Sequence, residues 1–400
     1  MESFFAAALK ETQAINKTLH IGITSVNFDV RPEGICSGRL VRALLNHGFK
    51  ITLITSKKAK IDYEHPRLKI IVLPYRPREP RFFFRFWAKL TGSIENNFFW
   101  WSRHALRQKF DNNDIPDIFY GRAWPYASLV PAYSFSIRYR VPFIAHLSDP
   151  IPPPNVVYPG AKSLENLQTM LNHAEAITFT NEETVEYQAR FTPFGENKAH
   201  VLPHVSPGVY KLPAAEKNAQ RYYHIGAIGK RRPILNVALD GFRLHLKNYP
   251  LAKMNFVNPK PREVRPDIRR LSLQEHVSIL PFAPDIRSIL TPATALISYE
   301  PKVETPIWTL TKTIEYLCAN RCIFALTSKG SPTEKLLRQF PESCVVVNDY
   351  DAKLIAQGYD RLAELEPSED HFAQRLEKMA DFRAENVAKK FEEICVSILG

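Results

Sequence analysis

Short apolar runs alternate with longer amphipathic segments twice along the chain. Each run has the length of a buried strand, and the segments between the runs have the three- and four-residue spacing of helices. Strands that alternate with helices form parallel sheets covered by helices. The pattern therefore predicts two doubly wound α/β lobes. The first has strands at residues 19–24, 49–55, 70–73, 117–120, 142–147, 176–180 and 199–202, and the second at 222–225, 253–257, 277–280, 295–299, 322–326 and 344–348.

The junction between the two series lies near residues 206–217, a stretch rich in proline and alanine with weak periodicity. A chain of 400 residues with 45% hydrophobic content is long enough for two domains of ordinary size. Residues 370–398 are amphipathic over a long span and carry mixed charge. We expect an N-terminal lobe over residues 1–207, a C-terminal lobe over 208–372 and a final helix over 373–400.

Residues 305–330 combine a helix, a strand and two opposite charges in one short unit. Leu310, Ile314 and Leu317 recur at helical spacing, and Asn320 tolerates the left-handed conformation that ends many helices. The apolar run that follows has the length of a buried strand. We therefore expect a helix that ends at Asn320 and leads directly into a strand.

Lys312 and Glu315 lie three residues apart near the start of this helix, so they occupy neighbouring positions on one face. A lysine neutralises phosphate, and a glutamate accepts hydrogen bonds from ribose hydroxyls. Together the two residues fit a nucleotide whose sugar and phosphates lie side by side. The alternative is an exposed ion pair that binds no ligand and contributes only about 0.3–0.5 kcal/mol.

A glycine-containing loop follows the first predicted strand of the second lobe. Residues 226–233 read GAIGKRRP, in which Gly229 precedes the cations Lys230, Arg231 and Arg232. Glycine lets the backbone approach a diphosphate closely, and the cations neutralise it. The spacing is not that of a P-loop, because no Ser or Thr follows the Gly-Lys pair. The alternative is a solvated basic turn.

Two further loops follow strands of the first lobe, at the edge where parallel sheets bind ligands. The loop at residues 27–38 contains Gly34, and the strand at 142–147 ends in His146 and Asp149. A histidine and a carboxylate at one strand end make a candidate catalytic pair. The alternative is a hydrogen-bonded histidine beside an aspartate that caps a helix.

The 53 basic residues exceed the 41 acidic ones, which gives a formal net charge of +12. Part of the excess lies in residues 76–109, which also contain two clusters of Phe and Trp. Such a mixture suits a membrane interface, where rings lie at headgroup depth and cations meet anionic lipid. The rings can equally pack in a core or an oligomer contact. Single-stranded nucleic acid, the third partner that such patches bind, is the one we do not expect.

The five cysteines are scattered and lie mostly in apolar runs, which indicates buried thiols in a reducing compartment. No cluster of Cys and His completes a zinc site. The N-terminus has an early Glu2 and no basic region, so it does not resemble a secretory signal. No apolar window approaches the ~18–20 residues of a membrane span. We expect a cytoplasmic protein, either soluble or docked peripherally on the inner face of the membrane.

The 305–330 unit resembles the donor-site segment of retaining GT-B glycosyltransferases of the GT4 type, whose usual form is close to P-x-K-x-x-E-Y-L-A-x-G-K-P-V. The matching residues are Pro306, Lys312, Glu315, Tyr316, Leu317, Ala319, Arg321 and Ile323. Asn320 stands where the family has glycine, and Cys322 where it usually has proline. Members often have a second glutamate eight residues before the first. Ile307 occupies that position here, and Glu300 and Glu304 are the nearby carboxylates that can replace it.

The resemblance implies a GT-B fold, which consists of two Rossmann-like lobes with a cleft between them and a C-terminal helix that crosses back to the first lobe. It places the acceptor in the N-terminal lobe and the nucleotide-sugar donor in the C-terminal lobe. It implies that Gly34 lies beside the sugar and phosphates of the donor, that Gly229 with Lys230 or Arg231 binds the diphosphate, and that the turn at Pro284 contacts the base.

The implied reaction is retaining transfer of a sugar from a nucleotide-sugar to a saccharide or lipid-linked saccharide in cell-envelope polysaccharide synthesis. Lys312 offsets the charge of the leaving diphosphate, Glu315 holds the ribose, and His146 and Asp149 face the acceptor. With these cations we expect no metal requirement and no cofactor. The alternatives are a catalytically silent nucleotide-sugar or membrane-binding module, consistent with Ile307, and a nucleotide-sugar epimerase or hydrolase that needs no acceptor.

Overall fold

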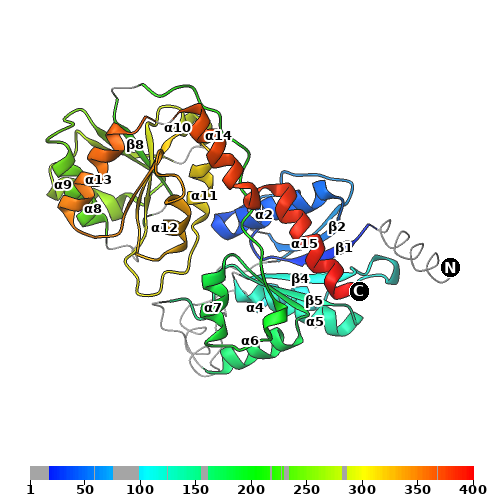
Figure 1. The fold of residues 1–400 in the computed structure, drawn as a ribbon. Coiled ribbons are helices and arrows are strands. Elements are labelled where there is room, and N and C mark those ends of the chain that lie inside the picture. Colours follow the sequence, from blue (N-terminus) through cyan, green and yellow to red (C-terminus); the bar gives the residue numbers. More distant parts are fainter. Residues whose placement is uncertain are drawn as a thin grey trace, which may run out of the picture. The chain divides into compact units, whose positions relative to one another are not determined.

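The chain divides into two compact units, each built on one parallel sheet (Figure 1). Unit 1 comprises Met1–Val205 and Ala384–Gly400, and unit 2 comprises Ser206–Arg383. The predicted α/β class with two doubly wound sheets is confirmed. The computed structural model describes residues 18–57, 59–74, 99–123, 125–154, 161–216, 219–226, 228, 234–281, 286–366 and 368–400.

The sheet of unit 1 has seven parallel strands in the order β3-β2-β1-β4-β5-β6-β7. The order reverses between β1 and β4, and the carboxyl ends of two such strands form the usual ligand-binding edge of an open α/β sheet. The strands are β1 (His20–Thr24), β2 (Lys50–Ser56), β3 (Leu68–Leu73), β4 (Ile118–Ala123), β5 (Phe143–Leu147), β6 (Ala176–Phe179) and β7 (Ala199–Val201).

Helices cover both faces of this sheet: α2 (Arg31–His47), α4 (Phe99–Leu106), α5 (Leu129–Tyr139), α6 (Ala161–His173), α7 (Glu182–Ala189) and α15 (Ala384–Leu399). The final helix α15 lies along α2 (Figure 1). Its buried Val387, Phe391 and Cys395 belong to the same core as Val41 and Leu44 of α2. The C-terminal helix therefore completes the core of unit 1, as the fold resemblance implied.

The sheet of unit 2 has six parallel strands in the order β10-β9-β8-β11-β12-β13, with its reversal between β8 and β11. The strands are β8 (Arg221–Ile225), β9 (Lys253–Val257), β10 (Val277–Leu280), β11 (Ala295–Tyr299), β12 (Cys322–Leu326) and β13 (Cys344–Val347). The helices are α8 (Leu235–His245), α9 (Pro261–Arg270), α10 (Ile286–Leu290), α11 (Thr311–Leu317), α12 (Pro332–Leu337), α13 (Ala352–Glu364) and α14 (Glu369–Lys378).

Aromatic rings fill the centre of the unit 2 core. The ring of Tyr359, on α13, stacks on Phe324 at 4.4 Å and on Tyr222 at 5.7 Å between centroids. The hydroxyls of Tyr359 and Tyr299 form a hydrogen bond, and Tyr299 stacks on His224 at 5.3 Å. His224 is the fourth residue of the five-residue strand β8. A chain of contacting rings therefore connects this core with the carboxyl end of β8.

Only part of the aromatic and basic stretch at residues 76–109 belongs to the described residues, because 75–98 lie outside them. In α4, Trp101 and Ala105 are fully buried and pack in a core of unit 1. Core packing therefore accounts for this ring, and a membrane contact through the rest of the stretch stays a prediction. Within the described part of the chain, no helix has the length and apolarity to cross a membrane.

Candidate functional site

The carboxyl end of β8 in unit 2 carries a buried histidine that contacts Lys312. Nδ1 of His224 lies 3.0 Å from the carbonyl oxygen of Ile297. A carbonyl oxygen only accepts hydrogen bonds, so Nδ1 carries the proton and Nε2 is an acceptor. Nζ of Lys312 lies 3.4 Å from Nε2 and donates to it. The imidazole therefore fixes the position of the ammonium group.

Helix α11 is fastened to the same strand end by Tyr316. The backbone N–H of Ile225 donates to the Tyr316 hydroxyl at 2.9 Å. Because Lys312 precedes Tyr316 by four residues, both side chains project from one face of α11. Gly226 follows directly with φ 98°, a conformation that side chains disfavour, and opens the basic loop. The structure thus brings Lys312 to the ligand-binding edge of the sheet.

The carboxylates near this edge differ in their surroundings. Glu315 is half-buried on α11. Glu300 directly follows β11, is buried, and accepts a hydrogen bond of 2.6 Å from the hydroxyl of Thr327. Glu304 is exposed, whereas Ile307 is only 2% exposed. Of the two carboxylates considered as replacements for the second family glutamate, Glu300 is the one held by the sheet edge.

Four predicted donor-binding residues lie outside the described residues: Gly229, Lys230, Arg231 and Pro284. The predicted clamp on a diphosphate and the predicted contact with a base therefore stay predictions. Of the predicted donor site in unit 2, the structure places Lys312 and Glu315, on one helix at the carboxyl edge.

In unit 1, Gly34 lies in the first turn of α2, directly against the loop that follows β1. A Cβ atom there would lie 3.1 Å from the carbonyl carbon of Asn27 and 3.1 Å from the amide nitrogen of Phe28. The side-chain amide of Asn27 in turn donates to Glu33 at 2.9 Å. A larger residue at Gly34 would push the loop away, so glycine allows the close approach of helix and loop.

A row of polar side chains crosses the neighbouring strands at the same edge. The parallel register pairs Arg122 of β4 with His146 of β5, and His146 with Thr178 of β6. Nε of Arg122 donates to Ser37 of α2 at 3.1 Å, and its Nη1 donates to the Tyr120 hydroxyl at 3.0 Å. Oγ1 of Thr178 lies 3.3 Å from that hydroxyl and 3.0 Å from Nδ1 of His146. This network connects α2 with His146.

His146 is buried in this network, and its Nε2 has no hydrogen-bond partner among the described residues. A small cavity beside it is also lined by Cys36, Leu40, Arg122 and residues 202–205. Burial lowers the pKa of His146 well below its usual value, and the charges of Arg122 and His204 lower it further. The imidazole is therefore neutral at pH 7.

Asp149 is half-buried two residues beyond the end of β5. Burial raises the pKa of Glu33 above its usual value, and the negative charge of Asp149 adds to this effect. Asp149 therefore lies close enough to the first turn of α2 for its charge to act on Glu33. The structure places His146 and Asp149 at one strand end, as expected, with His146 directed to Thr178.

We expect the free energy of unfolding to fall as the pH drops below about 6.5, in part because of His146. Its pKa is near 6.5 in the unfolded chain and well below that in the native protein, so the unfolded state binds the proton more strongly. The stability that neutral His146 provides is complete above pH 6.5 and is lost as the pH falls toward the native pKa. Urea unfolding measured from about pH 7.5 to 5.0 tests this.

The variant His146→Gln should have a flatter dependence of unfolding free energy on pH than the wild type. The matched control is His104→Gln, which replaces a half-buried imidazole of α4. An unchanged slope in His146→Gln would show that other groups cause the acid sensitivity.

No family model and no curated protein matches the chain. Solved structures match nearly all of it. Anabaena HepE, in complex with UDP and glucose, aligns with a TM-score of 0.69 and 12% identity over 95% of this chain and 100% of that chain. A glycosyltransferase from Rickettsia africae aligns with a TM-score of 0.63 and 13% identity over 96% and 99% of the two chains. WaaG, a glycosyltransferase involved in lipopolysaccharide biosynthesis, aligns at 0.60 and 10% over 94% and 99%.

These likenesses extend over 94% to 96% of this chain, so they concern both sheets and not one lobe. At 10% to 13% identity they establish the fold alone. The narrower GT4 assignment that the 305–330 unit suggested stays a prediction.

Proposed function

Because the chain has the GT-B fold, we propose that it is a glycosyltransferase that moves a sugar from a nucleotide-sugar donor to a saccharide or lipid-linked saccharide. The observation that carries the proposal is Lys312, held by His224 at the carboxyl end of β8 next to Gly226. An ammonium group fixed there fits a donor diphosphate. HepE crystallised with UDP-glucose and the role of WaaG in lipopolysaccharide synthesis support a nucleotide-sugar donor and a cell-envelope acceptor.

In the proposed reaction, the bond between the anomeric carbon and the diphosphate oxygen breaks, and a bond to an acceptor hydroxyl forms on the same face of the sugar. The departing phosphate takes the acceptor proton, so the products are a nucleoside diphosphate and the glycosylated acceptor with retained configuration. Lys312 stabilises the negative charge that grows on the diphosphate, and it is already in place before the reaction. Glu315 is proposed to bind the ribose.

Because the leaving phosphate accepts the proton, the acceptor side needs no strong base. We assign the neutral His146 and Asp149 to hydrogen bonds with the acceptor.

The cations Lys312 and Lys230 or Arg231 take the charge-neutralising role that a divalent metal has in other transferases. Turnover should therefore be the same with EDTA as without it, and a loss of turnover that Mg²⁺ or Mn²⁺ restores would overturn this part of the proposal.

Thermal unfolding with UDP-, GDP-, ADP- and dTDP-sugars tests the donor site. We expect one nucleotide class to raise the Tm, because a ligand that binds only the native state stabilises it. Release of the nucleoside diphosphate that depends on an added saccharide acceptor would support the transferase, whereas turnover of the donor without acceptor would indicate an epimerase or hydrolase. The absence of any Tm shift would contradict the donor site.

A catalytically silent nucleotide-sugar-binding module is the second candidate. The observation that favours it is Ile307, whose buried side chain occupies the position of the second family glutamate. A silent module would show the Tm shift with the same nucleotide-sugar and no product with any acceptor. If the variant Ile307→Glu then forms product, the missing glutamate is the cause of the silence. If it does not, activity does not depend on this position alone.

A further inference from the structure

Unit 2 contains a cavity of about 450 Å³ at the edge of its sheet opposite to Lys312. Four of the lining residues each come directly before a strand: Gln220, Thr294, Arg321 and Ser343. The cavity therefore lies at the amino ends of β8, β11, β12 and β13, whereas Lys312 lies at the carboxyl end of β8. Its volume is in the range of small-molecule sites, which is roughly 300–1,000 Å³.

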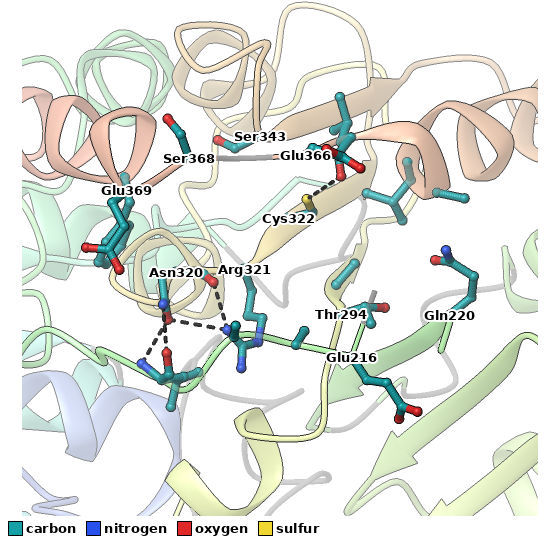
Figure 2. A pocket seen from close by; sticks show the side chains of 18 of the residues that line it. Glu216, Gln220, Thr294, Asn320, Arg321, Cys322, Ser343, Glu366, Ser368 and Glu369 are labelled. Atoms are coloured by element: carbon teal, nitrogen blue, oxygen red, sulfur yellow. Dashed lines mark hydrogen bonds between the residues drawn. The ribbon is translucent and has the colours of Figure 1, made fainter. Parts of the chain in front are cut away.

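The end of α13, the start of α14 and linker residues between 212 and 216 also line the cavity. Figure 2 shows Glu216, Gln220 and Thr294 on one side of the hollow, with Ser343, Ser368 and Glu369 on the other. Glu216, Glu366 and Glu369 are exposed, so the rim carries carboxylates. The deeply buried lining side chains include two arginines, Arg321 and Arg375, which are 3% and 1% exposed.

Both guanidinium groups donate to neutral oxygens. Nη2 of Arg321 donates to the carbonyl oxygens of Pro213 and Thr291 at 2.8 and 3.0 Å. Nη1 of Arg375 donates to the carbonyl oxygen of Arg321 at 3.1 Å and to Oγ of Ser343 at 3.2 Å. The Nε–H group of each arginine has no hydrogen-bond partner among the described residues. One donor of each guanidinium is therefore left over.

The negative charge that would balance the arginines is also missing from the described part of the chain. Neither guanidinium has a carboxylate within salt-bridge distance there. The nearby thiols do not provide it, because burial raises the pKa of Cys322 to about 12 and that of Cys344 to about 11. Both thiols are neutral at pH 7. Buried charges without a partner are costly, so an anion would bind favourably beside them.

We propose that this cavity binds a small phosphomonoester of a polyhydroxy compound. The two buried positive charges behind its base favour a dianionic phosphate. Their Nε–H groups are enclosed, so the attraction acts across the lining and not through a hydrogen bond. The cavity is larger than phosphate, and its rim offers Glu216, Gln220 and Ser368 as hydrogen-bond partners for hydroxyls. The site is independent of the proposed donor site, and it stands if that function is wrong.

The proposal is tested by thermal unfolding of the full chain with the substitution Lys312→Ala, which removes one phosphate contact of the proposed donor site. The probes are glycerol 3-phosphate and glucose 6-phosphate, with glycerol, glucose and sodium chloride at matched ionic strength as references. We expect a rise in Tm of about 2–4 °C with a phosphate ester at roughly tenfold its Kd. A shift no larger than that given by the references would overturn the proposal.

Ala363→Phe, added to this background, fills the cavity without changing either arginine. Gln357→Phe is the matched control. It places the same ring on the exposed face of α13, the helix that also carries Ala363. The shift should be lost in the first variant and kept in the second. An equal shift in both would mean that the phosphate esters bind elsewhere.

Glu369→Gln removes a negative charge from the rim and leaves the base of the cavity intact. It should tighten binding of the phosphate esters by about twofold, as expected for one exposed charge. Weaker binding in Glu369→Gln would overturn the placement of the phosphate beside the arginines.

Discussion

Replacing Lys312 with alanine is expected to lower kcat/KM for the nucleotide-sugar donor by about 100- to 1000-fold, the usual cost of removing one preorganised group that stabilises transition-state charge. The lysine is held by His224 and by the anchoring of α11 through Tyr316, so its ammonium group is fixed in advance at this edge. Steady-state release of the nucleoside diphosphate measures the loss. The Tm shift caused by the donor should disappear in parallel.

Lys353→Ala, on the exposed side of α13, is the control for a general effect of lost charge and should behave as the wild type. His224→Phe keeps a ring against Tyr299 but removes the nitrogen that receives the Lys312 hydrogen bond. It should reduce kcat less than Lys312→Ala, because the ammonium group is still present but is no longer fixed. Activity of Lys312→Ala within twofold of the wild type would refute the assigned role.

Replacing Tyr359 with alanine is expected to lower the free energy of unfolding of unit 2 by about 3–5 kcal/mol, the cost of deleting a large buried aromatic side chain. Its ring is fully buried and stacks on Phe324 and Tyr222, and its hydroxyl bonds to Tyr299. The vacated volume cannot close, because these neighbours are fixed on strands of the sheet. Urea unfolding followed by circular dichroism measures the change.

Tyr359→Phe is the matched variant, since it keeps the ring and removes only the hydrogen bond to Tyr299. It should cost about 1 kcal/mol. Because Tyr299 stacks on His224, Tyr359→Ala should also weaken donor binding, and Tyr359→Phe should do so less. A loss of stability in Tyr359→Ala as small as that in Tyr359→Phe would show that the stacked rings contribute little.

The strands were predictable from sequence because a fully buried parallel strand is a continuous apolar run, and β12 is an example. The residue at which the preceding helix, α11, ends was harder to predict. The helix expected to continue to Asn320 ends at Leu317. Asn320 instead exchanges two hydrogen bonds of 2.9 Å with the backbone of Leu212, a residue of the distant linker. A tertiary partner thus opens the last turn, and local spacing contains no sign of it.

The residues of the candidate site also differ in whether the sequence could predict their roles. Lys312 was predictable because its spacing from Glu315 and Tyr316 is local. His224 and Arg122 were not, because each acquires its role only when the sheet register is set. Nothing near Arg122 in the sequence indicates that it lies between Ser37 and Tyr120 or that the register places it beside His146. Residues that meet across strands need the register, and the register is a property of the whole sheet.

The position of α15 in the core of unit 1 has a consequence for synthesis of the chain. Unit 2 ends at Arg383, whereas unit 1 also requires α15, which includes Phe391 and Cys395. A growing chain therefore begins unit 1 before unit 2 but completes it only after unit 2. Until α15 has been synthesised, the apolar side of α2 that it covers stays open to solvent. Premature termination after residue 383 would spare the unit that is translated second and expose the core of the unit that is translated first.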